Sequence, residues 1–383
     1  MINYINQSLI ISFITLSSSL LANDLIFSTP CDSKNQQATI SFVGDILIHK
    51  ALYQSVVLES KHFSQLWKNT TPLIQKADFS VANLEGPVAL GIDQNGKDRG
   101  DIGFVYDGDV YSGTNYQFNY HPRILSDLKA SGYDLLTVAN NHAEDRFSIG
   151  IDRTLEAAKA INIFTVGTRS SQFPIEEYYK IAQINNMHVA FIGCTEFLNI
   201  PDNRNQILTC EGEQIFKTIK ALANNDLVDA IIVLPHWGVE YSHVPKTYQK
   251  EYARKYLEAG AIAVVGSHPH VLQPWEKYTT KNGRETLIIY SLGNFVAGQA
   301  GLDRQVGTVA YLGISKNNNQ KSKIFGVAYT PTYRTGNNIN PIGKNGPVKI
   351  LNHVSLMYGT KARVDPLDGL PTTMCSNHPA KTQ

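Results

Sequence analysis

Five short apolar runs in this sequence are each closely followed by side chains that can bind a metal. The runs and their polar followers are 40–43 with Asp45, 79–82 with Asn83 and Glu85, 135–139 with Asn141 and His142, 231–235 with His236, and 262–265 with His268 and His270. Apolar runs of this length that alternate with helical patterns predict an α/β fold. Ligands in such folds bind beyond the carboxyl ends of the strands, so we expect these side chains to meet at one rim.

The residue types at this rim suit a divalent transition metal, because they offer imidazole nitrogen, carboxylate oxygen and amide oxygen without thiolate. They exceed what one ion needs, and two ions about 3.5–4 Å apart would use them. Each signal alone has a simpler reading. An Asp after a strand is usually a turn residue or a helix cap, and His236 is also compatible with a buried, satisfied histidine. Their conjunction indicates a metal site, because turns seldom need imidazole and this rim would gather four.

The same patterns predict the elements of the fold. We expect strands at 38–43, 79–82, 135–139, 189–192, 230–234, 262–265 and 287–290, and helices at 63–76, 122–130, 148–161, 214–223 and 246–259. Segments 178–184 and 188–192, joined by Asn185-Asn186, predict a hairpin, so the sheet is mixed and a second sheet is plausible. Residues 86–120 read as a long loop, and 306–312 and 348–357 as strand-like patches. The domains expected are a leader at 1–22, an N-terminal segment at 23–37, one domain at 38–330, and a closing strand and tail at 331–383.

The first 22 residues contain no Lys, Arg, Asp or Glu, and their apolar run ends in Ser-Leu-Leu-Ala. This pattern predicts a secretory signal cleaved near Ala22; an uncleaved N-terminal anchor is the alternative. The protein is then expected in the periplasm or cell envelope, with no transmembrane segment after cleavage.

The four cysteines fit export, and none belongs to a CxxC pair, which argues against a structural zinc site. The favoured pairing is Cys194–Cys210 and Cys31–Cys375. Four reduced thiols become the better reading if the leader prediction is wrong.

The net charge of +1, from 34 Lys+Arg against 33 Asp+Glu, argues against nucleic acid held by bulk electrostatics. No nucleic-acid partner is expected. Only His121, Arg123 and Arg146 place cations near the presumed rim.

Six motifs occur in an order that resembles a known family. They are Val43-Gly44-Asp45, Ala82-Asn83-Leu84-Glu85, Ala139-Asn140-Asn141-His142, His236-Trp237-Gly238-Val239-Glu240-Tyr241, Gly266-Ser267-His268-Pro269-His270-Val271 and Ser291-Leu292-Gly293-Asn294-Phe295. They resemble the CapA-like proteins of poly-γ-glutamate capsule synthesis, a family similar in fold to the calcineurin-like metallophosphatases. The resemblance covers roughly residues 38–300, and the tail after about residue 315 matches less clearly.

The resemblance implies a four-layer α/β/β/α sandwich with two divalent transition metals, of the Mn, Zn or Fe type, at the strand ends. By position it implies a bridging carboxylate at Glu85 and a general acid at His142. The other implied metal ligands are Asp45, Asn141, His236, His268 and His270. One position departs from the wider superfamily, which has a His where this chain has Leu47. Either the first metal has one ligand fewer, or another residue such as His49 replaces it.

Three functions remain open from the sequence. The first is an envelope metal-dependent hydrolase, with a metal-activated hydroxide as nucleophile, acting on a phosphoester or on the γ-amide bond of a glutamate polymer. The second is a non-catalytic accessory that binds the anionic polymer, with capsule synthesis machinery as a possible partner. The third is a periplasmic phosphoesterase, which the near-neutral charge disfavours. Glu240, Tyr241 and Asn83 are candidate substrate contacts; an exposed loop is an equal reading of the first two.

Overall fold

A computed structural model describes residues 24–371 and Met374, apart from 31, 33–34, 115–116, 174–176, 202–204 and 318–320. The expected leader and the expected Cys31–Cys375 pair lie outside the described residues. Within the described part of the chain, no helix combines the length and the apolar character needed to cross a bilayer.

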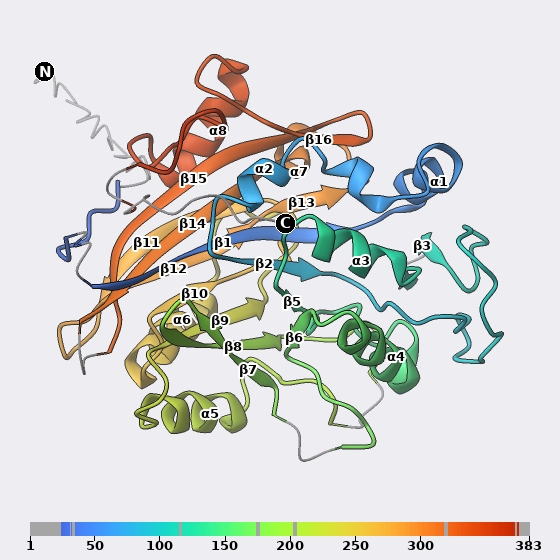
Figure 1. Cartoon of the computed structure of the whole chain (residues 1–383), viewed down its shortest axis with the longest axis horizontal. Coiled ribbons are helices and arrows are strands. Elements are labelled where there is room, and N and C mark those ends of the chain that lie inside the picture. The colour runs from blue at the N-terminus through green and yellow to red at the C-terminus, as the bar shows by residue number, and fades with distance from the viewer. Residues whose placement is uncertain are drawn as a thin grey trace, which may run out of the picture.

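Two mixed sheets form the centre of the molecule (Figure 1). The first has the order β16-β15-β14-β1-β2-β5-β6, with β13 also pairing β1, and the second has the order β11-β12-β10-β9-β8-β7. The strands of the first sheet are β1 (Gln36–Leu47), β2 (Phe79–Leu84), β5 (Leu135–Thr137), β6 (Phe164–Val166), β13 (Asn294–Ala297), β14 (Val306–Lys316), β15 (Lys323–Thr335) and β16 (Asn338–Pro341). Those of the second are β7 (Tyr179–Ile184), β8 (Met187–Thr195), β9 (Ala230–His236), β10 (Ala263–Val265), β11 (Leu272–Thr279) and β12 (Glu285–Leu292).

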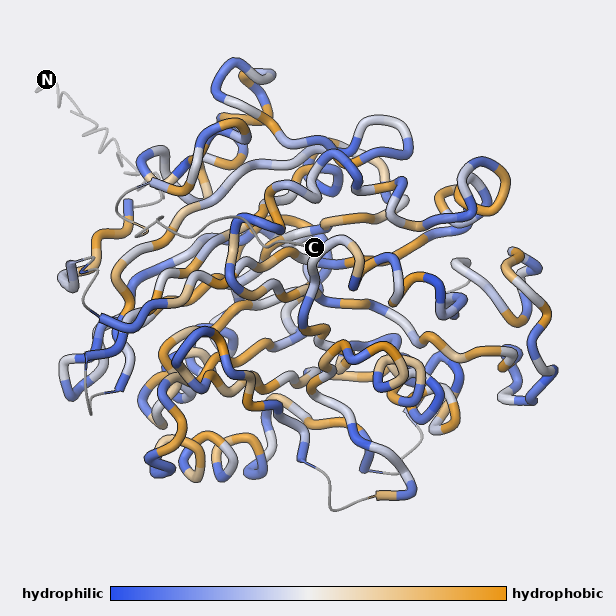
Figure 2. Tube along the Cα trace, viewed as in Figure 1, coloured by the Kyte–Doolittle hydropathy of each residue, from blue (hydrophilic) through white to orange (hydrophobic). Residues whose placement is uncertain are grey.

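The two sheets pack face to face because their strands are apolar on both sides. Successive side chains of a strand point to opposite faces. In β9, Ile232 and Leu234 therefore enter the core between the sheets, while Ile231 and Val233 enter the core beneath the outer helices. In β2, Val81 joins the central core in the same way. Figure 2 shows hydrophobic residues along the strands and hydrophilic residues at many of the loop tips.

Helices cover the outer face of each sheet. The first sheet is covered by α1 (Lys50–Glu59), the 3-10 helix η1 (Phe63–Leu66), α2 (Thr71–Ile74), α3 (Arg123–Ala130) and α4 (Phe147–Ala160), and the second by α5 (Glu213–Ala223) and α6 (Thr247–Ala259). A further helix, α8 (Val348–Tyr358), lies beside β11 and β15, where the ring of Tyr358 stacks on Trp275 at 4.8 Å. The expected four-layer α/β/β/α sandwich is confirmed.

Two predicted elements are wrong. Segment 348–357, expected as a strand, forms α8, whose buried residues Ile350, Val354 and Tyr358 recur every four residues. That spacing is the helical period, which the apolar composition of the segment concealed. The single helix expected at 63–76 is broken into η1 and α2.

Other expectations hold. β7 and β8 form the predicted hairpin, with Asn185 in the left-handed region at φ 52°. The predicted Cys194–Cys210 disulfide is confirmed, and both cysteines are buried under α5 and α6. The long segment 86–120 contains the short strands β3 (Ser112–Thr114) and β4 (Gln117–Asn119).

Candidate metal centre

The carboxyl ends of strands from both sheets meet at one rim of the sandwich. β1 and β2 bring Asp45 beside Asn83, and the ladder shifts register at this point. His236 is the last residue of β9 and bridges to Ser267 in the loop after β10. Gly44 allows this convergence, because a Cβ there would lie 1.8 Å from a backbone oxygen of the neighbouring Gly293.

The first ligand group consists of Asp45, Glu85 and His270, with one ligand atom from each within 4.8 Å of the others. Nδ1 of His270 lies 3.0 Å from Oδ2 of Asp45, and the opposite nitrogen, Nε2, is on the Glu85 side. That nitrogen is 3.8 Å from Oε1 of Glu85. All three side chains are buried.

The second group consists of Glu85, His236 and His268. Nε2 of His236 lies 3.6 Å from Oε1 of Glu85 and 3.1 Å from Nδ1 of His268. The side-chain oxygen of Asn141 is 2.8 Å from the same His236 nitrogen. Three kinds of ligand atom thus converge on one point.

Glu85 belongs to both groups, and its environment tests whether the residues fit a metal. The side chain is fully buried, and neither carboxylate oxygen has a hydrogen-bond partner in the described part of the chain. Burial raises the pKa of Glu85 well above its usual range, against the charge of His270, which lowers it. A buried carboxylate without hydrogen bonds is costly unless a cation pairs with it. The donor set therefore fits divalent metals at this point.

The three candidate histidine ligands differ in how the protein shifts their pKa values. His268 and His270 both have positive φ, 100° and 58°, which is uncommon outside glycine and costs backbone energy at sites where it persists. Burial, with the charge of His270 and His142, lowers the pKa of His268 to about 3, and burial lowers that of His236 well below its usual value. Neutral imidazoles are the form that binds metal. Burial opposes protonation of His270 too, but Glu85 and Asp45 raise its pKa to about 9.

His142 lies beside the groups without belonging to either. Its Nδ1 is 2.7 Å from Oδ2 of Asp145, and both side chains are buried. The edge of Phe118 packs against its ring at 4.8 Å. Burial raises the pKa of Asp145, although the hydrogen bond from His142 opposes this. Sequence reasoning missed Asp145; its spacing of three residues from His142 was the available signal.

Asn294 is a second residue that sequence reasoning left without a role. Its Oδ1 lies 3.0 Å from Nδ1 of His270, on the same side as Asp45, and its amide donates to the backbone oxygen of Arg304. It lies in one of the six motifs quoted above, which was the signal for it.

The candidate substrate contacts divide between the rim and the interior. Glu240 is exposed and lies within 4.8 Å of His268 and His270, and the exposed Tyr241 has its ring 6.1 Å from that of His270. Asn83 is instead buried inside the cluster. Its amide nitrogen donates to Oδ1 of Asp45 and lies 3.2 Å from Nδ1 of His236. This favours a positioning role for Asn83 over contact with substrate.

Two other expectations about the rim need correction. Arg146 is fully buried, and its guanidinium donates to interior groups such as the backbone oxygen of Ile92. His49, considered as the replacement at Leu47, is absent from every ligand group of the described residues. Its Nδ1 lies 3.0 Å from the oxygen of Leu47 and 3.1 Å from the nitrogen of Gly298.

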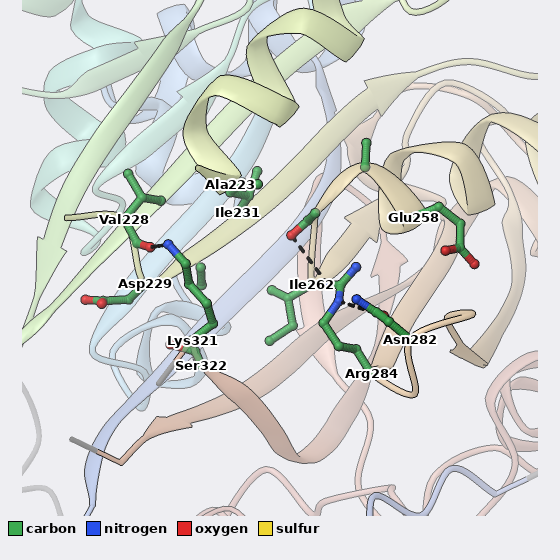
Figure 3. A pocket seen from close by; sticks show the side chains of 13 residues that line it. Ala223, Val228, Asp229, Ile231, Glu258, Ile262, Asn282, Arg284, Lys321 and Ser322 are labelled. Atoms are coloured by element: carbon green, nitrogen blue, oxygen red, sulfur yellow. Dashed lines mark hydrogen bonds between the residues drawn. The ribbon is translucent and has the colours of Figure 1, made fainter. Parts of the chain in front are cut away.

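A cavity of about 300 Å³ lies at the opposite, amino-terminal ends of the second sheet's strands (Figure 3). Two cations line it, but both are bonded to backbone oxygens: Arg284 donates to Ala261 and Lys321 to Val228. These bonds stabilise loop and helix ends and occupy donors of both cations.

The family of the chain follows from comparison with known proteins. The family model described as "Bacterial capsule synthesis protein PGA_cap" matches residues 39–299, which is more than half of the chain. The chain belongs to this family. The matched span contains every candidate ligand of the two groups, so the PGA_cap region and the candidate metal centre coincide.

Curated relatives agree with this membership. The chain is 30% identical over 263 residues to "PGA biosynthesis protein CapA" of Bacillus subtilis (strain 168), covering 68% of this chain and 63% of the relative. It is 27% identical over 278 residues to "Capsule biosynthesis protein CapA" of Bacillus anthracis, covering 70% and 61%. The chain thus spans less than two thirds of the length of each relative.

Solved structures are more distant. The NAD nucleotidase NadN of Haemophilus influenzae is 13% identical at a TM-score of 0.45, over 89% of this chain and 58% of that one. A 5'-nucleotidase from Candida albicans SC5314 is 16% identical at a TM-score of 0.40, over 77% and 51%. At these scores the fold assignment rests on the sheet order and the three cores described above.

Proposed function

We propose that this chain is an envelope-localised, metal-dependent hydrolase that acts in the synthesis or processing of an anionic capsule polymer such as poly-γ-glutamate. The proposal rests on one observation above all, the buried Glu85 carboxylate shared by two groups of ligands. Membership of a capsule synthesis family supplies the biological context. Export through removal of residues 1–22 is part of the proposal.

Glu85 would contribute to the binding of two ions. Asp45 and His270 would complete one site, and His236 and His268, with the Asn141 oxygen, the other. When bound, a pair of divalent ions polarises an acyl or phosphoryl oxygen and provides a nucleophile near neutral pH.

His142 would move the proton. Its Nδ1 is engaged by Asp145, which holds the ring so that Nε2 is left to face a leaving group. The amide nitrogen of Asn199 lies 3.4 Å from both ring nitrogens of the same imidazole and would help to hold the ring in place. General acid catalysis of this kind requires a positioned, titratable group beside the reacting bond.

The side chains at the outer edge of the rim would suit an elongated anionic substrate. Tyr241 is exposed there, and the guanidinium of Arg304 lies over its ring at 5.0 Å. Gln299 donates to the hydroxyl of Tyr241. This cation and the adjacent hydrogen-bond donors would attract a polymer carboxylate, while Glu240 would face the metal side of the rim.

The test measures whether the protein shortens the polymer chain. Purified protein loaded with Mn²⁺, Zn²⁺ or Fe²⁺ is incubated with poly-γ-glutamate, and the polymer is sized by chromatography beside a Glu85→Gln sample. We expect shortening by the wild type alone. Retention of the polymer with unchanged length would instead identify a non-catalytic accessory, and turnover of small phosphoesters alone would identify a phosphoesterase.

A further inference from the structure

A second cluster of potential ligands lies outside the centre described above. It joins His243 from the loop after β9, Asp303 from the short helix α7 (Leu302–Gln305) and His353 from α8. One ligand atom from each lies within 4.8 Å of the others. Three segments far apart in the sequence therefore meet at one carboxylate, and none of the three residues belongs to the groups around Glu85.

The spacing in this cluster is too long for direct bonds and suits a bridging ion. Nε2 of His243 is 3.6 Å from Oδ2 of Asp303, and Nδ1 of His353 is 3.8 Å from Oδ1. Hydrogen bonds between such groups are shorter than about 3.2 Å. Ligands that lie about 2.0–2.2 Å from a tetrahedral metal are separated from one another by roughly 3.4 Å.

The His243 imidazole is oriented as a metal ligand is. Its Nδ1 donates to the backbone oxygen of Leu272 at 2.8 Å, which directs Nε2 toward Asp303. Such a bond to a backbone oxygen is the usual means of orienting a metal-bound histidine. In His353 the nitrogen that faces Asp303 is Nδ1, and the opposite nitrogen, Nε2, is buried without a hydrogen-bond partner in the described residues. Burial also lowers the pKa of His353, which favours the neutral ring that coordination requires.

The surroundings leave room for an ion to enter and for water to complete its coordination. The side chain of Asp303 is 57% exposed and that of His243 27%, whereas His353 is 13% exposed. The neighbouring cation does not compete for the carboxylate, because the guanidinium of Arg304 lies over the ring of Tyr241. Two imidazoles and one carboxylate with an open fourth position form a ligand set typical of zinc.

We propose that His243, Asp303 and His353 form a separate mononuclear site for Zn²⁺ or a similar divalent transition metal. The ion would fasten α7 and α8 to the loop that begins at Gly238 and contains Glu240 and Tyr241. The proposal does not depend on the proposed hydrolase function, because it concerns metal binding by residues outside the centre.

The experiment counts zinc bound per chain after the purified protein has been stripped with a chelator. Equilibrium dialysis with elemental analysis compares the wild type with two double variants and one single variant. These are His243→Ala/His353→Ala, His268→Ala/His270→Ala, and His188→Ala. His188 is the control. It is a half-exposed histidine on β8, and its side chain lies near that of Asp229. We expect the first variant to bind one Zn²⁺ fewer than the wild type, the second to retain this site, and the control to equal the wild type.

Asp303→Asn provides a variant that preserves shape at an exposed position, and circular dichroism checks the fold of each protein. Loss of this ligand should weaken the site at least about tenfold in calorimetric titration with Zn²⁺ in the His268→Ala/His270→Ala background. Equal zinc stoichiometry in the wild type and in His243→Ala/His353→Ala, or unchanged affinity in Asp303→Asn, would overturn the proposal.

Discussion

Oε1 of Glu85 lies 3.6 Å from Nε2 of His236, and both side chains are completely buried. The contact is too long for a hydrogen bond, yet it joins the end of a strand in one sheet to the end of a strand in the other. The same oxygen lies 3.8 Å from His270. Glu85 is therefore the point at which the two halves of the sandwich share one candidate centre.

Replacing His268 and His270 together by Ala should remove metal with limited damage to the fold. Both residues lie in a loop beyond β10. Their backbone has positive φ, which is not a stabilising feature produced by the imidazole side chains. Elemental analysis should show metal loss from the centre beside a near-native circular dichroism spectrum. His188→Ala is the matched control, and full retention of metal by the double variant would refute the ligand assignment.

Removing the imidazole of His142 should affect substrates according to their leaving groups. His142→Ala is expected to keep the metals and to lose about 10²- to 10⁴-fold in turnover of substrates with poor leaving groups. An activated nitrophenyl ester, which needs no proton on departure, should lose much less. Asp145→Asn should follow the same pattern more weakly, because it removes only the carboxylate charge beside Nδ1. Equal losses on both substrates, with metals intact, would exclude the acid role.

The disulfide is expected to contribute measurably to stability. Cys194 and Cys210 are 16 residues apart, and a loop of that size is worth about 3 kcal/mol in the chain-entropy model. Cys194→Ala/Cys210→Ala should lower the free energy of unfolding in urea by about that amount and should leave the metal centre occupied. A variant as stable as the oxidised wild type would show that the bond is dispensable.

Export predicts a shorter mature chain. If residues 1–22 are removed, the intact mass of protein recovered from the envelope should correspond to a start near Asn23. A mass that includes residues 1–22 would contradict cleavage and favour an N-terminal anchor.

The apolar runs and their polar followers were sufficient to predict an α/β fold and the rim, because both follow from local pattern, whereas the four-layer sandwich was implied by the family resemblance. β9 is an example: its alternating residues Ile231 and Ile232 enter two different cores, and His236 falls at its end. The local pattern does not show which segments that are distant in the sequence lie close together in the fold. The pairing of His142 with Asp145 was open to local inspection, but the meeting of His243 with His353 arises only from tertiary packing.

Predictions from the sequence were wrong where one local composition is compatible with two structures. Segment 348–357 is apolar enough to be a strand, and its helical period is seen in the spacing of the residues that the structure buries, including Tyr358, which stacks on Trp275. Arg146 follows the rim motif in sequence, but its side chain turns inward to backbone oxygens. A charge near a site in the sequence is thus no measure of charge at the site.

The most direct test is the rate at which the wild type and Glu85→Gln hydrolyse an activated ester at saturating Mn²⁺. The substitution preserves the shape of the side chain and removes the charge that both ligand groups share. Metal-ion catalysis supplies several kcal/mol, so the account predicts a loss of about 100-fold or more, with the fold unchanged by circular dichroism. A Glu85→Gln protein that hydrolyses the ester as fast as the wild type would contradict the account.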